Sequence, residues 1–593
     1  MDVEVLRSRS PRSMASVAAV MRALVRGSEL WVVVLATAVG VVGGLLVAGM
    51  SFLTQFMHAH LFGIDPDERL SAVIHIDSLP AALVPIAGGL IMGLTTYLTR
   101  RYRRRTAVDP ITANAVHGGR MSMTDSTIVT AQTVISNGFG ASVGLEAGYT
   151  QIAAAVASLL GRLFRLRRND MRVLVGCGAA AGIAAAFDAP LTGAFYGFEL
   201  IIGVYSIGNV APVMASAIVS TLVVRALGAP NMPIAIAEAV PMLTKQYALF
   251  IGMGLVAGAL GIVIMRLVTT VETMLRLLPL PDLLRPAVGG AVVGGLALLT
   301  PQVLSSGHGA LHLDLGQHLP LTGLAVLLML KILASAVSIG SGFRGGLFFA
   351  SLFLGSLMGE LMAGVGALIS PAIAINPTTA AVVGMSALAV AVVGGPLTMT
   401  FLALESTNNF IITGIVLAAA VVSSMTVRET FGYSFSTWRL HLRGESIRSA
   451  HDVGWMRSLT AGRMMRQDVR TVRDDMALAE FRRQFPIGST QRVIVIDAAD
   501  RYAGIIPVPE AFAAENGTAS RVSDLVQHRS DMLLPAMNVK EAIAMFDRTE
   551  SEALAVVDDL QNRHVLGLLS EAHATRRYAE ELDKVRRGLS GEV

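Results

Sequence analysis

Long apolar segments separated by short polar ones fill most of the chain. They span residues 29–61, 81–98, 128–160, 171–204 and 213–227, and they continue with interruptions to residue 427. A helix that crosses a bilayer perpendicularly needs roughly 20 apolar residues, and several of these segments are shorter or are broken by glycine and proline. The pattern therefore predicts an α-helical polytopic membrane protein with tilted, broken and re-entrant helices.

Two parts of this apolar region resemble each other. The segments at 140–148 and 342–350 both place several glycines ahead of an apolar run. The motifs Ala-Pro-Leu-Thr and Gly-Pro-Leu-Thr then lead to Glu199 and Glu405, and the two glutamates, like the two prolines, lie 206 residues apart. Interrupted helices at matching places in two halves are typical of transporters built from inverted-topology repeats, with the binding site at the repeat interface.

The composition becomes polar and mixed in charge after about Arg439. Amphipathic patterns at 476–485 and 537–546, which are 61 residues apart, each precede a buried-strand pattern, at 493–497 and 554–558. We therefore expect two α/β units in this tail. The expected organisation is an amphipathic segment, a membrane domain, a linker and two α/β modules, at 1–27, 28–440, 441–458, 459–515 and 520–585.

Charge agrees with a membrane location. Only 15% of the 593 residues are charged and the mean hydropathy is +0.60, whereas soluble proteins have roughly 25% charged residues. Arginines between positions 7 and 26 precede a first apolar segment that is too long for a cleaved signal, so the N-terminus is expected in the cytoplasm. The net charge of +4 comes from such flanks, so nucleic acid is not an expected partner. The one cysteine, Cys177, is expected to be a packing residue.

Several short motifs carry a family resemblance. They are Thr-Ala-Val-Asp-Pro at 106–110, Gly-Leu-Glu-Ala-Gly at 144–148, Phe-Asp-Ala-Pro-Leu-Thr-Gly at 187–193, Gly-Leu-Phe-Phe-Ala at 346–350, Gly-Pro-Leu-Thr at 395–398 and Leu-Glu-Ser-Thr-Asn at 404–408. Over residues 28–440 they resemble the CLC family of chloride channels and chloride/proton antiporters. In that family, motifs of the types GSGIP, GREGP and GxFxP place helix N-termini around the anion. The GSGIP-type fit is loose.

The resemblance implies the CLC fold and transport of chloride or another small anion across the cell membrane. It also implies a homodimer in the lipid bilayer, with one anion path in each subunit and protons as further partners if the protein is an antiporter. The two α/β units resemble a tandem pair of cystathionine-β-synthase (CBS) domains and would lie in the cytoplasm.

Anion binding also follows from physical reasoning about these residues. A helix N-terminus offers about half a positive charge and unpaired N–H groups, which bind an anion without holding it too tightly to leave. The alternative is that the glycines only allow close packing of helices. The candidate anion-binding residues are Gly144, Leu145, Glu146, Ala147, Gly346, Leu347, Phe348, Phe349, Thr106 and Ala107.

Glu146 is the candidate gate. Its carboxylate lies within an apolar segment, between glycines, at the expected first turn of a helix. Ionised, it would take the place of an anion, and protonated, it would leave and open the path. The resemblance implies the same gating role. The alternative is a side chain that only stabilises the first turn of the helix.

Three departures from the family pattern bear on mechanism. The serine that holds the central anion corresponds to Ala107, unless Thr106 replaces it. The tyrosine of the inner gate corresponds to Ser436, with Phe435 beside it as a second candidate. The internal proton-relay glutamate of many antiporters corresponds to Leu200. These departures slightly favour passive, channel-like conduction of chloride over the alternative, chloride/proton antiport.

Other polar residues are interpreted as structural. Asp109 is expected to cap a helix, and Lys331 is expected to support the fold. His308 and His312 have helical metal-ligand spacing with Asp314 nearby, but this stretch is expected to be a solvated loop and no metal site is expected.

No catalytic residues are identified. The membrane region has neither a His-Glu-x-x-His nor a Gly-x-Ser-x-Gly motif, so a membrane-embedded enzyme is a remote alternative, as is a CBS-regulated cation transporter. The ribose-binding signature of the CBS pair lacks its aspartate, with Glu510 and His573 at the two positions. Adenine nucleotide is therefore an open but unsupported ligand, and no other cofactor is expected.

Overall fold

The computed structural model describes residues 29–73, 75, 79–103, 107–229, 246–316, 319–369, 374–442, 459–514 and 520–590. The chain divides into two compact units, Met1–His451 and Asp452–Val593. The expected segment 1–27 lies outside the described residues, and so does the expected linker apart from residues 441 and 442.

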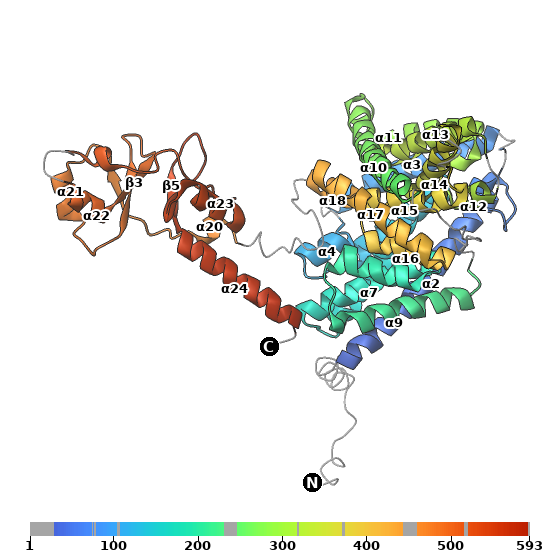
Figure 1. Ribbon diagram of the computed structural model, residues 1–593, viewed down its shortest axis with the longest axis horizontal. Coiled ribbons are helices and arrows are strands. Elements are labelled where there is room, and N and C mark those ends of the chain that lie inside the picture. The colour runs from blue at the N-terminus through green and yellow to red at the C-terminus, as the bar shows by residue number, and fades with distance from the viewer. Residues whose placement is uncertain are drawn as a thin grey trace, which may run out of the picture. The chain divides into compact units, whose positions relative to one another are not determined.

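The first unit is built from helices of very uneven length (Figure 1). In chain order they are α2 (Glu29–Phe62), η2 (Leu70–Ala72), α3 (Leu79–Tyr102), α4 (Pro110–Val116), α5 (Met123–Gly138), α6 (Glu146–Leu163), α7 (Arg168–Phe187), α8 (Pro190–Tyr196), η3 (Gly197–Ile202), α9 (Ile207–Ala226), α10 (Gln246–Leu277), α11 (Arg285–Leu299), η4 (Pro301–Val303), α12 (His308–Gly316), α13 (Leu321–Ser341), α14 (Phe348–Ile369), α15 (Pro377–Val393), α16 (Pro396–Thr407), α17 (Phe410–Thr430) and α18 (Phe435–Leu442).

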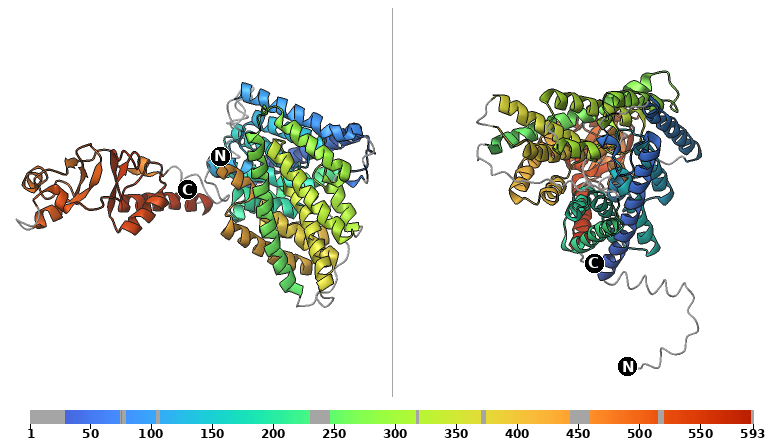
Figure 2. Two further views of the ribbon diagram at one scale, coloured as in Figure 1. Left: turned by 90° about the horizontal axis from the view of Figure 1, so that it is seen from above. Right: turned by 90° about the vertical axis from the view of Figure 1, so that its right-hand side faces the viewer.

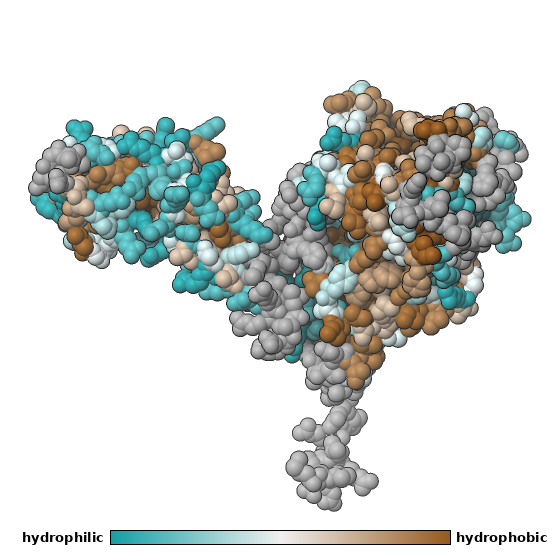
Figure 3. Space-filling model, viewed as in Figure 1, coloured by the Kyte–Doolittle hydropathy of each residue, from teal (hydrophilic) through white to brown (hydrophobic). Residues whose placement is uncertain are grey.

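Within the described residues, eight helices are long and apolar enough to cross a membrane. They cross one another at many angles instead of lying parallel (Figure 2), and exposed apolar side chains such as Val34, Leu94 and Val263 give the unit a hydrophobic face (Figure 3). Short helices such as α4 and α8 lie between the long ones. The predicted membrane protein with broken helices is confirmed.

The predicted repeat is visible in the packing of the helices. The eight helices α2–α9 recur in order as α10–α17. Helix α6 packs along α7 as α14 packs along α15, and α2 packs along α9 as α10 packs along α17. The two halves meet where α3 packs on its counterpart α11 and α8 packs on its counterpart α16.

The repeated glutamates join the two halves by an exchange of hydrogen bonds. Glu199 accepts from the backbone N–H groups of Leu397 (3.0 Å) and Thr398 (2.8 Å) at the start of α16. Glu405 accepts from the equivalent groups of Leu191 and Thr192, at 2.8 and 2.9 Å, at the start of α8.

Each glutamate also accepts a hydrogen bond from a threonine hydroxyl of the helix that it caps, Thr398 or Thr192. The rings of Phe195 and Phe401, again 206 residues apart, stack with their centroids 4.0 Å from each other. Each half therefore supplies acceptors for the unpaired N–H groups, and a negative charge for the positive dipole end, at the start of the other half's short helix.

The second unit contains two strand–helix units. Its elements are α20 (Ala461–Met464), β1 (Thr471–Arg473), α21 (Leu478–Gln484), β2 (Arg492–Ile496), β3 (Tyr502–Pro507), α22 (Val508–Ala513), η6 (Val522–Leu525), α23 (Val539–Thr549), β4 (Ala553–Val557), β5 (Val565–Ser570) and α24 (Glu571–Ser590). Strand β2 pairs with β3 as β4 pairs with β5, both antiparallel, and both pairs have an irregularity after equivalent valines, Val495 and Val556. The repeat predicted for the tail is confirmed.

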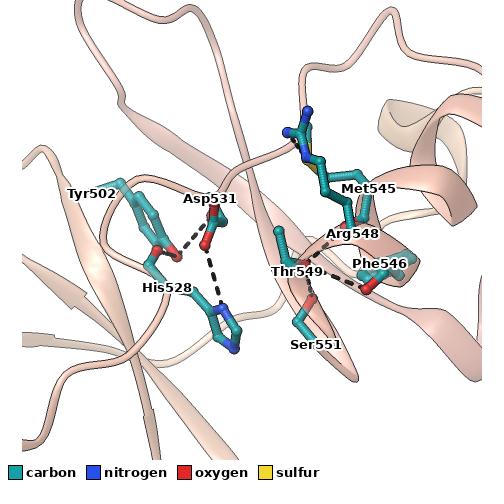
Figure 4. A network of polar contacts seen from close by, with 8 residues as sticks. All are labelled: Tyr502, His528, Asp531, Met545, Phe546, Arg548, Thr549 and Ser551. Carbon is teal, nitrogen blue, oxygen red and sulfur yellow. Dashed lines mark hydrogen bonds and ion pairs between the residues drawn. The ribbon is translucent and has the colours of Figure 1, made fainter.

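Hydrogen bonds and packing join the two halves of the second unit. Tyr502 donates its N–H to the carbonyl of Arg563 (2.9 Å), and its hydroxyl to the carbonyl of His528 (2.8 Å), in the connector between the halves (Figure 4). The segment 459–466, which the sequence assigns to the first module, packs instead in the core of the second, because Leu459, Ala461 and Met464 join its buried cluster.

The exchanged glutamates give a stability prediction. Glu199→Gln and Glu405→Gln should each lower the melting temperature of the detergent-solubilised protein by several degrees, because each hydrogen bond to a charged group contributes about 1.5–3 kcal/mol. The matched control is Glu272→Gln, since Glu272 pairs only with Arg276 at the helix surface, where such pairs contribute about 0–1 kcal/mol. Equal melting temperatures for all three variants would contradict the stabilising role of the exchange.

Candidate functional site

Two hydrogen bonds between glycines join the two repeats next to their broken helices. The N–H of Gly144 donates to the carbonyl of Gly346 (2.9 Å), and the N–H of Gly346 donates to the carbonyl of Gly144 (3.2 Å). This pair immediately precedes α6 and α14. The two candidate anion motifs, about two hundred residues apart in sequence, are therefore side by side.

Both helices begin with backbone donors directed into this region. The first intrahelical bonds run from Tyr149 to Leu145 in α6 and from Ser351 to Leu347 in α14, so the preceding N–H groups have no acceptor within their helices. Leu145, at the N-cap of α6, makes no side-chain cap. These donors and the helix dipoles make the region electropositive.

The Glu146 carboxyl fills part of this region. The residue is 3% exposed, so it does not face lipid, and its Oε2 has no hydrogen-bond partner among the described residues. The carboxyl lies over Gly144, where a Cβ atom would overlap with Oε2. Gly144 therefore has to be glycine for the side chain to lie here, and a carboxylate at this place takes the position of an anion.

Aromatic packing fixes the start of α14. The rings of Phe348 and Phe349 lie 4.9 and 6.0 Å from the ring of Phe187, between centroids. Because both side chains are buried in this cluster, their backbone N–H groups are held in place. Sequence reasoning named Leu347, Phe348 and Phe349, and the structure brings them next to the Gly144–Gly346 pair.

Tyr196 is a site residue that sequence reasoning missed. Its ring lies 6.1 Å from that of Phe348, and it lies near Thr150 of α6 and within electrostatic range of both Asp109 and Glu146. The residue is partly exposed. A tyrosine inside the apolar run of α8 was the available signal, because a buried phenol usually needs a polar partner.

The first motif stands at the start of α4. Asp109 caps this helix by accepting from the N–H of Thr112 (2.8 Å), which confirms its interpretation as a cap. Gln151 of α6 donates to the carbonyl of Val108 (2.9 Å), which ties the motif to the helix of Glu146. Ala107 is partly exposed and Thr106 lies outside the described residues, so their role in anion binding stays a prediction.

The inner-gate candidates begin α18. Phe435 is buried in the cluster that contains Phe348 and Phe349, whereas Ser436 is partly exposed. Gly394 approaches both Leu200 and Ser434, so the leucine that replaces the proton-relay glutamate lies near the start of this helix. Gating by Phe435 or Ser436 stays a prediction.

The remaining polar candidates are Lys331 and the polar residues of α12. The Lys331 ammonium is fully buried and donates to the carbonyls of Val303 (3.0 Å) and Ser305 (2.9 Å), which confirms its structural interpretation. The expectation of a solvated loop around His308, His312 and Asp314 is wrong. These residues lie in α12, whose Ala310 and Leu311 are fully buried. No group of three His, Cys, Asp or Glu suited to a metal occurs among the described residues.

Comparison with known proteins shows the family to which this chain belongs. Residues 88–428, more than half of the chain, match the family model described as voltage gated chloride channel. The chain belongs to the CLC family of voltage-gated chloride channels. A putative chloride channel protein, ClcB-like, from Ralstonia nicotianae is 34% identical over 354 residues, which cover 59% of this chain and 82% of the relative.

Solved CLC structures share the fold. A slow cyanobacterial Cl⁻/H⁺ antiporter is 24% identical with a TM-score of 0.61, over 70% of this chain and 97% of that chain. A eukaryotic CLC transporter is 18% identical with a TM-score of 0.59, over 94% of this chain and 98% of that chain. The fold of this chain is thus that of CLC transporters, and the family transports anions.

The position of the Glu146 carboxyl over Gly144 gives a prediction. In Gly144→Ala the new methyl group occupies the space of Oε2, and because this atom ends a flexible side chain, the carboxyl should move out while the backbone pair remains. Anion efflux from proteoliposomes should become several-fold faster at neutral pH and lose most of its pH dependence.

Gly346→Ala is the matched control. Its Cβ would lie 3.5 Å from the Ala147 Cβ, an ordinary contact, so this variant should keep the pH dependence of the wild type. Wild-type behaviour in both variants would contradict the position described for the Glu146 carboxyl.

Proposed function

We propose that this protein is an anion/proton antiporter that moves chloride or a similar small anion past Glu146. The observation that carries the proposal is the buried, partnerless carboxyl oxygen of Glu146 beside the N-termini of α6 and α14. A carboxylate that occupies an anion position at a helix N-terminus competes with the anion. Protonation removes this competition, so the movement of the anion and the movement of the proton become linked.

Proton coupling is better supported than the passive conduction that the sequence slightly favours. The cyanobacterial protein with the same fold is a Cl⁻/H⁺ antiporter, and the buried carboxyl of Glu146 is a group that could bind the coupled proton. Passive conduction remains the second candidate, because Leu200 replaces the relay glutamate and the relative from Ralstonia is named a chloride channel.

A group of polar side chains on the α4 side of Glu146 supports a proton route that does not need the relay glutamate replaced by Leu200. Tyr196 is partly exposed and lies near the hydroxyl of Thr150. Thr150 in turn donates to the carbonyl of Glu146 (3.0 Å). Asp109, also partly exposed, lies within electrostatic range of Tyr196. We infer that Asp109, Tyr196 and Thr150 guide protons toward the Glu146 carboxyl, which binds and releases them, on a route that does not include residue 200.

The assembly and topology of the protein form part of the proposal. The N-terminus and the tail lie in the cytoplasm of a multi-pass cell-membrane protein, in agreement with the arginines at the junction of α6 and α7, Arg162, Arg165, Arg167 and Arg168. The repeated α/β units of the tail are a CBS pair, and two copies of the chain form a homodimer. The carboxylate of Glu510, at one ribose-binding position, accepts from Gln527 (2.6 Å), which gives no support for a bound nucleotide.

Replacement of Glu146 tests the proposal. Glu146→Gln and Glu146→Ala should keep anion efflux from proteoliposomes but lose proton movement against its gradient and the rise of flux toward low pH. The physical reason is that neither side chain exchanges a proton. The control is Glu272→Gln, at the surface of α10. Chloride-driven proton uptake that persists in both Glu146 variants would exclude this glutamate as the coupling group.

Tyr196→Phe tests the proton route separately. It removes one hydroxyl and keeps the ring against Phe348, so proton uptake should fall about tenfold or more while anion efflux changes less. Tyr97→Phe, in the exposed part of α3, is the control. An unchanged ratio of protons to anions would rule out the Tyr196 hydroxyl as part of the route.

A further inference from the structure

A second polar space lies next to the site, at the N-terminal end of α6 and away from the junction of α6 with α7. It is a cavity of about 50 Å³, larger than the roughly 10–15 Å³ that one water molecule requires. Its walls come from the second half of α2, the loop around η2, the ends of α5 and α7, the first turn of α6, and the loop before α12. The residues are Ser51, Thr54, His58, Arg69, Leu70, Ser71, Asn137, Leu145, Tyr149, Ala186, Ser305, Ser306 and His308.

Arg69 gives this cavity a positive charge. Its guanidinium donates to Oε1 of Gln55 (3.3 Å), and it has no carboxylate within ion-pair distance in the described parts of the chain. Gln55 itself is held by the carbonyls of Pro66 (2.9 Å) and Glu68 (2.6 Å). Because a guanidinium has five donors, an oriented arginine without an acidic partner in this wall has donors left for a ligand.

The other walls supply neutral donors and no carboxylate. Thr54 is 4% exposed, and its buried hydroxyl makes no hydrogen bond with the described residues. Ser71 accepts from the N–H groups of Gly309 (3.0 Å) and Ala310 (3.3 Å), so its own proton is directed elsewhere. A buried hydroxyl without a partner costs about 1–3 kcal/mol, which an anion in this cavity would offset.

The cavity adjoins the two helix ends that form the anion site, the start of α6 and the start of α14. Tyr149 lines it and lies within electrostatic range of both the Arg69 guanidinium and the Glu146 carboxyl. His308, on the opposite wall, stacks on the ring of Phe349 at 3.4 Å between centroids. The first turn of α12, which His308 begins, is the repeat counterpart of the start of α4, where the first motif stands.

We propose that this cavity is an outer anion-binding site, in which Arg69, Thr54 and Ser71 hold chloride or a similar monovalent anion beside Glu146. This inference rests on the proposed function, because the anion there is the transported one. The site holds an anion close to the path while the glutamate occupies the path itself. When the carboxyl is protonated and leaves, this anion enters the region between α6 and α14.

Kinetics of uptake give the first test. Arg69→Gln should raise the outer chloride concentration for half-maximal uptake by roughly tenfold to a hundredfold, as expected for the loss of a charged hydrogen bond, and should leave the maximal rate and the proton ratio unchanged. Arg69→Lys, which keeps the charge, should restore most of the affinity. Thr54→Val, which keeps the shape, should raise the half-maximal concentration several-fold.

Unchanged outer affinity in Arg69→Gln would overturn the proposal, and so would an equal loss of affinity in the glutamine and lysine variants, since this would indicate a structural effect of the arginine.

Bromide, which scatters X-rays anomalously, gives the direct test. Crystals of the full-length wild type in bromide should show a peak between Arg69 and Thr54 that disappears in Arg69→Gln. A cavity that contains only water in the wild type would overturn the outer site. A peak beside the N–H groups of Leu347–Phe349 reports on the proposed function independently, so the failure of either claim can be distinguished from that of the other.

Discussion

The reciprocal hydrogen bonds between Gly144 and Gly346 are the constraint on which the site depends. They satisfy one donor and one acceptor of each glycine and bring two helix N-termini together inside an apolar unit. The next donors along α6 and α14 remain without helical partners, and together with the helix dipoles they make the region electropositive. Such a region attracts an anion weakly, as transport requires, and its nearest acidic group is the side chain that follows the pair by two residues.

The exchange of glutamates between the halves explains how short helices persist near this pair. Helices α8 and α16 begin with proline and have 7 and 12 residues, and each needs an acceptor for its first N–H groups. Glu199 and Glu405 provide these acceptors from opposite halves. The same arrangement places Phe187, directly before α8, against Phe348 and Phe349, so the interface between repeats and the anion site form one packed structure.

Sequence reasoning identified the residues and segments that repeat along the chain or that belong to a short local motif. The glycines at 144 and 346, Glu146, the paired glutamates and the two halves of the tail all fall into these classes, and the structure places the glycines and Glu146 together. It missed Tyr196 and Arg69, because their significance depends on contacts with residues far away in the chain. It was wrong about α12, since the polar residues at 305, 306, 308, 312 and 314 conceal the buried Ala310 and Leu311. It also assigned 459–466 to the wrong half of the tail, because a short segment carries no signal of the core that it joins.

Diffraction from bromide-soaked crystals of the Glu146→Ala variant tests the central claim most directly. The account predicts an anomalous peak beside the Leu347–Phe349 amides and a second peak over Gly144, in the space that the carboxyl occupies in the wild type. Absence of bromide from both positions in well-ordered crystals would contradict it, because backbone donors at the ends of α6 and α14 would then not bind an anion.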